Sequence, residues 1–285
     1  MGPILLFSHP DEDLTMSIVE CVSAGVPYLH CDAMDAAGGV AHGFSTRLGG
    51  VSEGIYESLN LGLNRGDDRE KVLENYRRFT AAIGADMEGL VLSSQVHGDV
   101  VRTVTTGDKG KGIFAKCDYE ADGLITDVPG ICLAVFSADC LPILLYDPVR
   151  WVVAAVHAGW RGTAIGIVTR AVEKMRDVYG SAPADILAAI GPGISKCCFE
   201  TDEDVPNAMT EAMGAAALHA MELRESGKFH VDLKRLNALR LERAGLSAEH
   251  ISISADCTMC QHDKYWSHRY TRGQRGSQAA MIQLL

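Results

Sequence analysis

The stretch Ala134–Thr163, AVFSADCLPILLYDPVRWVVAAVHAGWRGT, decides the fold. Apolar residues run over Leu141–Tyr146, and a second apolar run, rich in β-branched residues, covers Trp151–Val156. The dipeptide Asp147-Pro148 between the two runs is a turn signal. The stretch therefore predicts two buried strands joined by a tight turn.

A thiol and an imidazole flank this pair of predicted strands. Cys140 precedes the first strand and His157 ends the second. Gly159 and Gly162 follow, and they leave room for a ligand or another backbone segment to come close. Because buried strands carry mainly apolar side chains, Cys140 and His157 beside Asp139 indicate a functional site.

Strand and helix patterns alternate along the rest of the chain. Helical spacing is found over residues 67–83, 163–179, 202–221 and 231–244, and short apolar runs predict strands at 90–93, 100–104, 121–126, 186–190, 251–254 and 279–284. The run at 100–104 is expected to pair with the one at 90–93. These patterns predict an α/β or α+β fold with a mixed sheet.

A single compact domain is expected over residues 36–285, because no linker or internal repeat divides that part of the chain. Residues 1–35 are expected to form an irregular or weakly structured N-terminal segment, with a short strand around Val26–Leu29. Short turns between strands favour a mixed sheet over a doubly wound parallel sheet.

The composition limits the classes of partner. The chain has 285 residues, 47% of them hydrophobic, and its formal net charge is −11. An acidic surface argues against nucleic acid and anionic membranes as partners, and no apolar stretch approaches the length of a membrane span. Nine cysteines without a secretion signal indicate reduced thiols in a cytoplasmic protein. The sequence does not define the oligomeric state.

Three strand ends carry possible metal ligands. They are Gln95-Val96-His97-Gly98, Ala138-Asp139-Cys140 and Val156-His157-Ala158-Gly159. Two imidazoles and one thiolate would leave a fourth tetrahedral position open, as catalytic zinc requires. The spacing alone fits equally well with three unrelated core or loop residues. A third interpretation uses no metal and makes Cys140 a nucleophile with His157 as its base.

The segment Phe44-Ser45-Thr46-Arg47, followed by Gly49-Gly50, places an arginine beside backbone N–H groups. Such a combination suits bidentate binding of phosphate. Taken alone, the segment is more typical of a surface arginine on a turn.

Four further cysteines form two pairs along the chain. Cys257-Thr258-Met259-Cys260 is a CxxC motif, and Cys197-Cys198 is a vicinal pair. Together they could make a four-thiolate structural zinc site. Because the chain has no second CxxC motif, buried free thiols are the favoured interpretation.

Several motifs are absent from the sequence. It contains no His-x-Glu followed by Pro-Cys-x-x-Cys and no Gly-x-x-x-x-Gly-Lys-Ser/Thr. It also lacks His-x-His, so the multi-histidine copper arrangement of a typical laccase is not visible.

Six motifs occur together and in order, and as a set they resemble the YfiH/YlmD-like family, also called laccase-domain or polyphenol-oxidase-like proteins. The motifs are FSTRLGGVS (44–52), SQVHG (94–98), ADCLPILLYDP (138–148), AAVHAGWRGT (154–163), IGPGISKCCFE (190–200) and DCT (256–258). The resemblance runs from about His42 to the C-terminus. It implies a fold similar to the catalytic fold of cytotoxic necrotizing factor, with a Cys–His site.

The resemblance implies a purine nucleoside phosphorylase that uses zinc and also deaminates adenosine. Zinc would be held by His97, Cys140 and His157, and Arg47 would hold phosphate. Ser45 and Gln95, within the matching motifs, are assigned to substrate binding. Phosphate would attack C1′ of adenosine, inosine, guanosine or methylthioadenosine, and zinc would polarise a water or the leaving base.

Two other functions stay open at this point. One is a copper-dependent polyphenol oxidase, which the family name suggests and the absence of His-x-His disfavours. The other is a metal-free Cys–His hydrolase that acts on a peptidoglycan precursor. The segment Tyr265–Gly276 departs from the family pattern, so no substrate contact is assigned to it.

Overall fold

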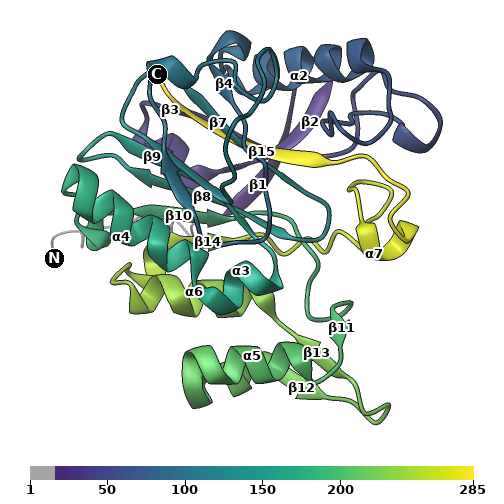
Figure 1. Cartoon of the computed structure of the whole chain (residues 1–285), viewed down its shortest axis with the longest axis vertical. Coiled ribbons are helices and arrows are strands. Elements are labelled where there is room, and N and C mark those ends of the chain that lie inside the picture. Colours follow the sequence, from purple (N-terminus) through teal and green to yellow (C-terminus); the bar gives the residue numbers. More distant parts are fainter. Residues whose placement is uncertain (1–16) are drawn as a thin grey trace, which may run out of the picture.

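Two six-stranded mixed sheets lie face to face in the computed structural model, which describes residues 17–285 (Figure 1). The first sheet consists of β1 (Ile18–Ser23), β2 (Val26–Cys31), β3 (Val40–Ser45), β15 (Gln278–Leu284), β7 (Cys132–Ser137) and β4 (Leu90–Val91), in this order. The second consists of β14 (Ile251–Ile253), β10 (Leu187–Ile190), β8 (Leu141–Asp147), β9 (Val152–Ala158), β6 (Gly123–Thr126) and β5 (Val101–Thr103). A small third sheet joins β11 (Glu200–Thr201), β13 (Phe229–Val231) and β12 (Met221–Leu223).

Helices cover the outer faces of the two large sheets (Figure 1). Helix α2 (Arg69–Ile83) packs on the first sheet, while α3 (Trp160–Ile165), α4 (Ile167–Tyr179) and α6 (Leu233–Arg243) pack on the second. The remaining helices are α1 (Asp32–Ala37), α5 (Asp204–Met213) and α7 (His268–Thr271). Short 3₁₀ helices span Gly54–Tyr56, Met87–Gly89, Thr106–Asp108, Pro183–Asp185, Gly214–Ala220 and Ala248–His250.

Strand β8 shows why both faces of the second sheet are buried. Leu144 and Tyr146 belong to the core between the sheets, whereas Ile143 and Leu145 belong to the core beneath the helices. Successive side chains of a strand point to opposite faces, so a strand buried on both sides reads as a continuous apolar run. The predicted hairpin is confirmed, since β8 pairs antiparallel with β9 from Leu141↔Ala158 to Asp147↔Val152.

Glycines in the left-handed region end or break the helices. Gly84 ends α2 with φ of 73°. The single helix predicted over residues 163–179 is wrong, because Gly166 has φ of 86° and separates α3 from α4. Among residues 17–285, no helix combines the length and the apolar character needed to cross a membrane.

Four other predicted elements need correction. The run at 100–104 does not pair with the one at 90–93, because β4 joins the first sheet through β7 and β5 joins the second through β6. The helix predicted over 202–221 ends at Met213 and continues as a 3₁₀ helix. The pattern at 231–244 begins with the end of β13, and α6 starts only at Leu233. The last correction concerns the N-terminal segment.

Residues 17–35 are not irregular. They form β1, β2 and the start of α1, and the strand predicted around Val26–Leu29 is confirmed as part of β2. Strand β2 pairs with β3 through Tyr28↔Ser45 and Leu29↔Phe44, so regular structure continues across the predicted boundary at residue 35. The part of that prediction covering residues 1–16 lies outside the described residues. The mixed α/β class and the single compact domain are confirmed.

Two connections cross from the first sheet to the second at the same end of the molecule. One leads from β4 to β5 and contains His97, and the other leads from β7 to β8 and contains Cys140. Strand β9, which ends at Ala158, brings His157 to this end as well. The topology therefore gathers three chemically active side chains where the chain changes sheets.

Candidate active site

His97, Cys140 and His157 meet at the crossing between the sheets. One ligand atom from each of the three lies within 4.8 Å of the other two. The distance from Cys140 Sγ to His97 Nε2 is 3.8 Å, and the two imidazole rings stand edge to face with centroids 4.8 Å apart. Segments separated in the sequence thus supply two nitrogens and one sulfur to one small volume.

A buried carboxylate, Asp122, organises this group. One of its oxygens lies 2.8 Å from His157 Nδ1. The two oxygens of the carboxylate also accept hydrogen bonds from the backbone N–H groups of Val96, His97 and Gly98, at 3.0, 3.0 and 2.8 Å. Asp122 therefore fixes both the ring of His157 and the loop that carries His97. Sequence reasoning missed this residue, although a lone carboxylate at the start of a buried strand was a usable signal.

Asp122, His157 and Cys140 each stabilise the charged form of a neighbour. Burial alone would raise the pKa of Asp122, but hydrogen bonds from His157 and the backbone of Gly98 lower it, so Asp122 is ionised and accepts the Nδ1–H of His157. Burial would lower the pKa of His157, yet the charges of Cys140 and Asp122 raise it to about 9. Burial also opposes ionisation of Cys140, but His157 and His97 lower its pKa to about 6. Without a metal, Cys140 and His157 form a thiolate–imidazolium pair.

The donor set fits a metal ion. Since His157 donates Nδ1–H to Asp122, its other ring nitrogen is left to face Cys140 as a possible ligand. A carboxylate that orients a histidine in this way is typical of zinc sites. Two nitrogens and one thiolate suit zinc with an open fourth position, and they also suit copper.

Two residues of the site have left-handed backbone conformations. His97 has φ of 62° and Asp139 has φ of 87°, values that residues other than glycine adopt only when their surroundings hold them. The Asp139 carboxylate accepts hydrogen bonds from Thr258 Oγ1 at 2.7 Å and from Arg269 N–H at 2.6 Å. Its carbonyl accepts from Ile194 N–H at 2.8 Å. These contacts fix the turn that presents Cys140.

Gly159 provides the close approach that the sequence predicted. A Cβ atom at this position would lie 2.8 Å from His97 Cδ2 and 3.2 Å from Cys140 Sγ. Gly159 has φ of −70°, an ordinary value for any residue, so glycine is needed here for space and not for backbone conformation.

A cavity of about 490 Å³ opens beside the three side chains. His97, Cys140 and His157 line it, together with Arg65 and Arg275. Its volume falls within the usual range of small-molecule sites, about 300–1,000 Å³. Sequence reasoning missed both arginines, which lie in loops whose glycines (Gly62 and Gly66, Gly273 and Gly276) were the available signal.

Arg275, one of the residues that line this cavity, carries a buried donor without a partner. Its Nη1 donates to the Gly276 carbonyl at 2.8 Å and to Ser277 Oγ at 3.1 Å, whereas its buried Nε has no hydrogen-bond partner. Burial, followed by the positive charge of Arg65, lowers the pKa of Arg275 to about 10. Because two neighbouring cations repel each other, an anion bound beside Arg65 and Arg275 would relieve this repulsion.

Gln95 lines the cavity, but its amide is already engaged. It accepts from Phe136 N–H at 2.7 Å and donates to the Phe136 carbonyl at 2.9 Å. Gln95 therefore fixes Phe136, whose side chain also lines the cavity and offers an aromatic surface.

Arg47 and Ser45 do not line the cavity. The Arg47 guanidinium stacks on the Trp266 ring at 4.0 Å and donates to the carbonyls of Glu57 and His262. Ser45 is buried and accepts from Ala279 N–H. The structure thus uses both side chains to hold backbone segments together.

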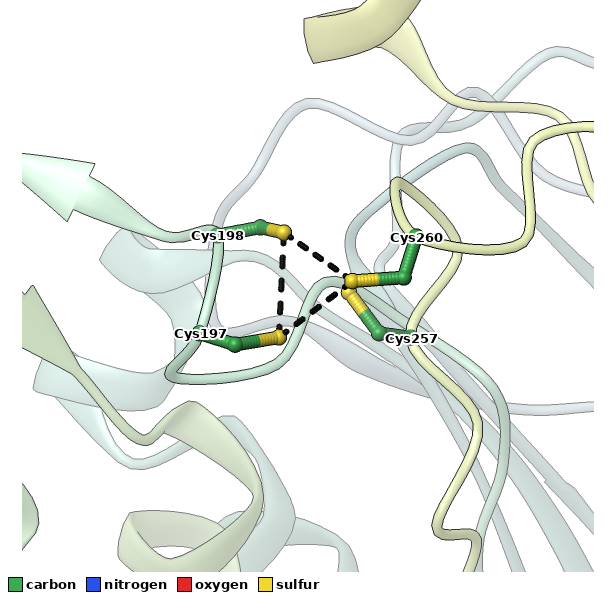
Figure 2. Close-up of side chains that lie close together, drawn as sticks. All are labelled: Cys197, Cys198, Cys257 and Cys260. Atoms are coloured by element: carbon green, nitrogen blue, oxygen red, sulfur yellow. Dashed lines mark hydrogen bonds between the residues drawn. The ribbon is translucent and has the colours of Figure 1, made fainter.

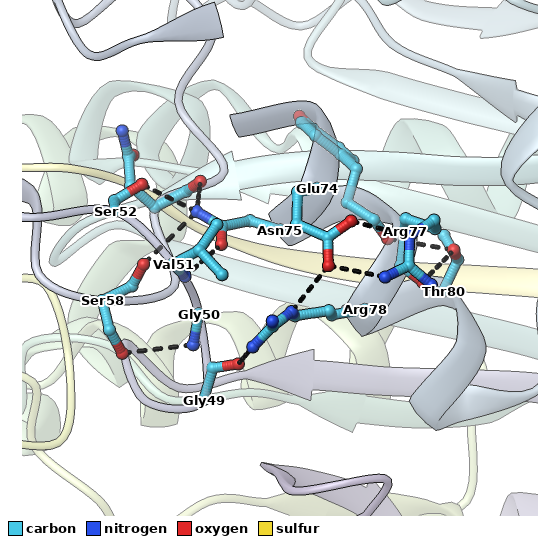
Figure 3. A network of polar contacts seen from close by, with 12 residues as sticks. Gly49, Gly50, Val51, Ser52, Ser58, Glu74, Asn75, Arg77, Arg78 and Thr80 are labelled. Carbon is cyan, nitrogen blue, oxygen red and sulfur yellow. Dashed lines mark hydrogen bonds and ion pairs between the residues drawn. The ribbon is translucent and has the colours of Figure 1, made fainter. Parts of the chain in front are cut away.

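The backbone N–H groups that follow Arg47 are also occupied (Figure 3). Gly50 N–H donates to Ser58 Oγ at 3.2 Å, and Val51 N–H donates to Asn75 Oδ1 at 2.8 Å. The Asn75 amide of α2 in turn donates to Ser52 Oγ and to the Asn60 carbonyl, both at 2.9 Å. These contacts shape the loop that leads to Arg65, and they leave few donors there for a phosphate.

The divergent segment at Tyr265–Gly276 is partly core. Tyr265 and Trp266 are fully buried, and the Trp266 indole N–H donates to the Leu59 carbonyl at 3.2 Å. Arg275, near the end of the segment, reaches the cavity.

The chain belongs to the family described as multi-copper polyphenol oxidoreductase laccase, whose model matches residues 41–285. This confirms the resemblance to YfiH/YlmD-like proteins. The chain is 39% identical over 257 residues to the purine nucleoside phosphorylase YlmD of Geobacillus stearothermophilus. These residues make up 90% of this chain and 93% of that protein. It is 39% identical over 246 residues to a purine nucleoside phosphorylase of Deinococcus radiodurans, with 86% and 89% covered.

Solved structures agree with this assignment. The crystal structure of YlmD from Geobacillus stearothermophilus superposes with a TM-score of 0.88 at 36% identity, covering 94% of this chain and 99% of that one. The crystal structure of a hypothetical protein YfiH from Bacillus licheniformis gives a TM-score of 0.87 at 34% identity, covering 93% and 99%.

The lowered pKa of Cys140 predicts its reactivity in metal-free protein. The thiolate is the reactive form, so the rate of alkylation by iodoacetamide should rise through pH about 6, well below the ordinary thiol value of 9.0. Peptide mapping by mass spectrometry after metal removal would follow Cys140 separately from the other cysteines. A rate that rises only near pH 9 would contradict the ion pair with His157.

Gly159→Ala should weaken metal binding without unfolding the protein. The added methyl group must displace His97 or Cys140, and a displaced ligand should cost at least about tenfold in affinity for zinc. Competition with a chromogenic chelator would measure this affinity. Gly107→Ala is the matched control, because its Cβ would meet no atom closer than 3.7 Å. Equal affinities in the two variants would contradict the role given to Gly159.

Proposed function

We propose that this protein is a zinc-dependent purine nucleoside phosphorylase acting on adenosine, inosine, guanosine and methylthioadenosine. The observation that carries the proposal is the pair of arginines, Arg65 and Arg275, that lines the same cavity as His97, Cys140 and His157. Relatives that share most of their length with this chain are named purine nucleoside phosphorylases, which supports the reaction class.

Arg65 and Arg275 are the residues we assign to phosphate. Both line the cavity, and each lowers the free energy of an anion placed between them. Arg47, the arginine predicted from the sequence, remains a competing assignment. Its guanidinium bonds to two backbone segments and stacks on Trp266, so phosphate binding there would require these contacts to break.

The nucleoside is assigned to the remaining space of the cavity. A volume of about 490 Å³ holds a purine nucleoside together with phosphate, and Phe136 offers an aromatic face on which the base can stack. Gln95 acts on substrate through Phe136, which its amide holds in place.

The reaction transfers the ribosyl group from the base to phosphate. A phosphate oxygen forms a bond to C1′ while the bond from C1′ to the base nitrogen breaks, and the electron pair leaves with the base, which then takes a proton. Arg65 and Arg275 hold the phosphate oxygens near C1′, so positioning and charge complementarity supply much of the rate enhancement. The products are a free purine and ribose 1-phosphate, or 5-methylthioribose 1-phosphate when the substrate is methylthioadenosine.

His97, Cys140 and His157 would hold the metal, which we assign as zinc. Bound zinc would supply a Lewis acid beside the reacting nucleoside. Asp122 keeps the His157 ring in its orientation through the Nδ1–H bond. Deamination of adenosine in the same cavity, and a cytoplasmic location, remain predictions.

Product analysis tests the proposed reaction. Metal-analysed protein is incubated with adenosine in the presence and absence of phosphate, and the products are identified by mass spectrometry. Adenine and ribose 1-phosphate that form only with phosphate would support the phosphorylase. Inosine as the sole product would replace it with a deaminase, and activity on phenols that requires copper would replace it with the oxidase.

A metal-free Cys–His hydrolase is the second candidate, favoured by the chain of contacts from Asp122 through His157 to Cys140. In this order a carboxylate orients an imidazole, and the imidazole stabilises a thiolate. Turnover of an amide-bearing cell-wall precursor that survives chelation but is lost on alkylation of Cys140 would favour this candidate.

Arg275→Ala should raise the KM for phosphate by about tenfold or more, because a hydrogen bond to a charged group is worth about 1.5–3 kcal/mol. Steady-state kinetics with phosphate as the varied substrate would measure the effect. Arg47→Ala is the direct comparison and should lower thermal stability while leaving the KM for phosphate unchanged. A phosphate-specific loss in Arg47→Ala, with none in Arg275→Ala, would reverse the assignment.

A further inference from the structure

A second cluster of metal-ligating side chains lies outside the candidate active site. It consists of Cys197, Cys198, Cys257 and Cys260, whose sulfur atoms all lie within 4.8 Å of one another. Figure 2 shows the four side chains turned toward a common centre from two loops. We refer to them as the four-cysteine cluster.

The topology of the second sheet brings the two loops together. Strands β10 and β14 pair in parallel through Ala188↔Ile251 to Ile190↔Ile253, so the segments that follow them leave the sheet side by side. Gly193 and Cys257 form a further parallel bridge, and Thr258 N–H donates to the Gly193 carbonyl at 3.2 Å. A vicinal pair and a CxxC motif, 60 residues apart along the chain, therefore face each other.

The sulfur separations fit one tetrahedral ion. Cys198 lies 3.3 Å from Cys260, Cys197 lies 3.6 Å from Cys260, and Cys197 lies 3.7 Å from Cys198. With zinc–sulfur bonds of ~2.3 Å, the edge of a regular ZnS₄ tetrahedron is ~3.8 Å. All nine cysteines, including these four, are free thiols.

The surroundings of the cluster suit thiolate ligands. Ser195 N–H donates to Cys257 Sγ at 3.4 Å, as backbone amides commonly do toward metal-bound sulfur. The buried Lys234 places its ammonium against the Ser254 and Asp256 carbonyls at 2.7 and 2.6 Å, beside the segment that carries Cys257. Four thiolates on a divalent ion carry two net negative charges, which this cation partly balances.

The four cysteines differ in their exposure to solvent. Cys257 is buried at 4% exposure, Cys198 is half-buried, and Cys197 and Cys260 are exposed. The prediction of buried thiols is therefore confirmed for Cys257 and wrong for Cys197 and Cys260, while Cys198 is only partly buried. A metal ion can therefore reach the cluster from solvent after the chain has folded.

We propose that Cys197, Cys198, Cys257 and Cys260 bind a structural zinc ion that clamps the loop after β10 to the loop after β14. All four tetrahedral positions would be filled by protein ligands, so the ion would have no position open for substrate. This site is separate from the one formed by His97, Cys140 and His157, and the proposal does not depend on the proposed function.

The clamp would act on the active site through Asp139. Thr258, next to Cys257, donates to the Asp139 carboxylate, and Ile194, on the other loop, donates to the Asp139 carbonyl. Both clamped loops thus hold the strained residue that precedes Cys140. Loss of the ion should loosen the turn that presents Cys140 to the cavity.

Zinc analysis of purified variants tests the proposal. Cys197→Ser/Cys260→Ser should carry about one zinc ion per chain fewer than wild-type protein. His97→Ala/His157→Ala, which removes the other site, should keep about one zinc ion, with X-ray absorption showing four sulfur ligands at ~2.3 Å. Cys21→Ser is the matched control and should retain the wild-type content.

Cobalt substitution provides a second readout that does not require activity. In His97→Ala/His157→Ala, added Co²⁺ should produce the intense visible bands and the thiolate charge-transfer band of a tetrahedral four-thiolate site. Adding Cys260→Ser to this variant should weaken and shift the charge-transfer band, because one thiolate ligand is lost, while circular dichroism shows retained folding.

Three outcomes would overturn the proposal. The first is equal zinc content in wild-type protein and Cys197→Ser/Cys260→Ser. The second is a disulfide within the four-cysteine cluster in protein purified under reducing conditions. The third is iron as the metal that remains in His97→Ala/His157→Ala.

Discussion

The Asp122 carboxylate is the contact on which the candidate active site depends. It is fully buried, and an ionised carboxylate is stable there only because His157 and three backbone N–H groups surround it. The same bonds hold the loop of His97 and select the nitrogen that His157 turns toward Cys140. Asp122, directly before β6, thus positions two of the three proposed ligands, while the contacts of Asp139 position the third.

Much of the fold could be predicted from the sequence, because apolar runs and turn signals are local. The hairpin of β8 and β9 followed from two apolar runs around Asp147-Pro148, and α2 followed from its helical spacing. The stacking of two sheets was not predictable in this way. A strand buried on both faces has the same apolar sequence pattern whether a helix layer or a second sheet covers it. The break at Gly166 was also missed, because a glycine within helical spacing can be tolerated without a break.

The three-residue group of His97, Cys140 and His157 could be predicted because each residue follows or precedes a recognisable strand. Its supporting contacts could not, because the hydrogen bonds that Asp122 accepts and the position of Arg275 beside the cavity depend on distances between segments remote in sequence. Arg47 shows that a local motif does not determine how the folded chain uses a side chain. Its motif suits phosphate binding, but the folded chain uses its guanidinium on backbone carbonyls and on an aromatic ring.

The affinity of the Asp122→Asn variant for zinc tests the central claim most directly. Chelator competition would compare it with wild type and with Asp127→Asn, an exposed carboxylate at the other end of β6. If Asp122 orients the ligands, the affinity of the His97–Cys140–His157 site should fall by about 10- to 100-fold, with no change in Asp127→Asn. An unchanged affinity in Asp122→Asn would contradict the account.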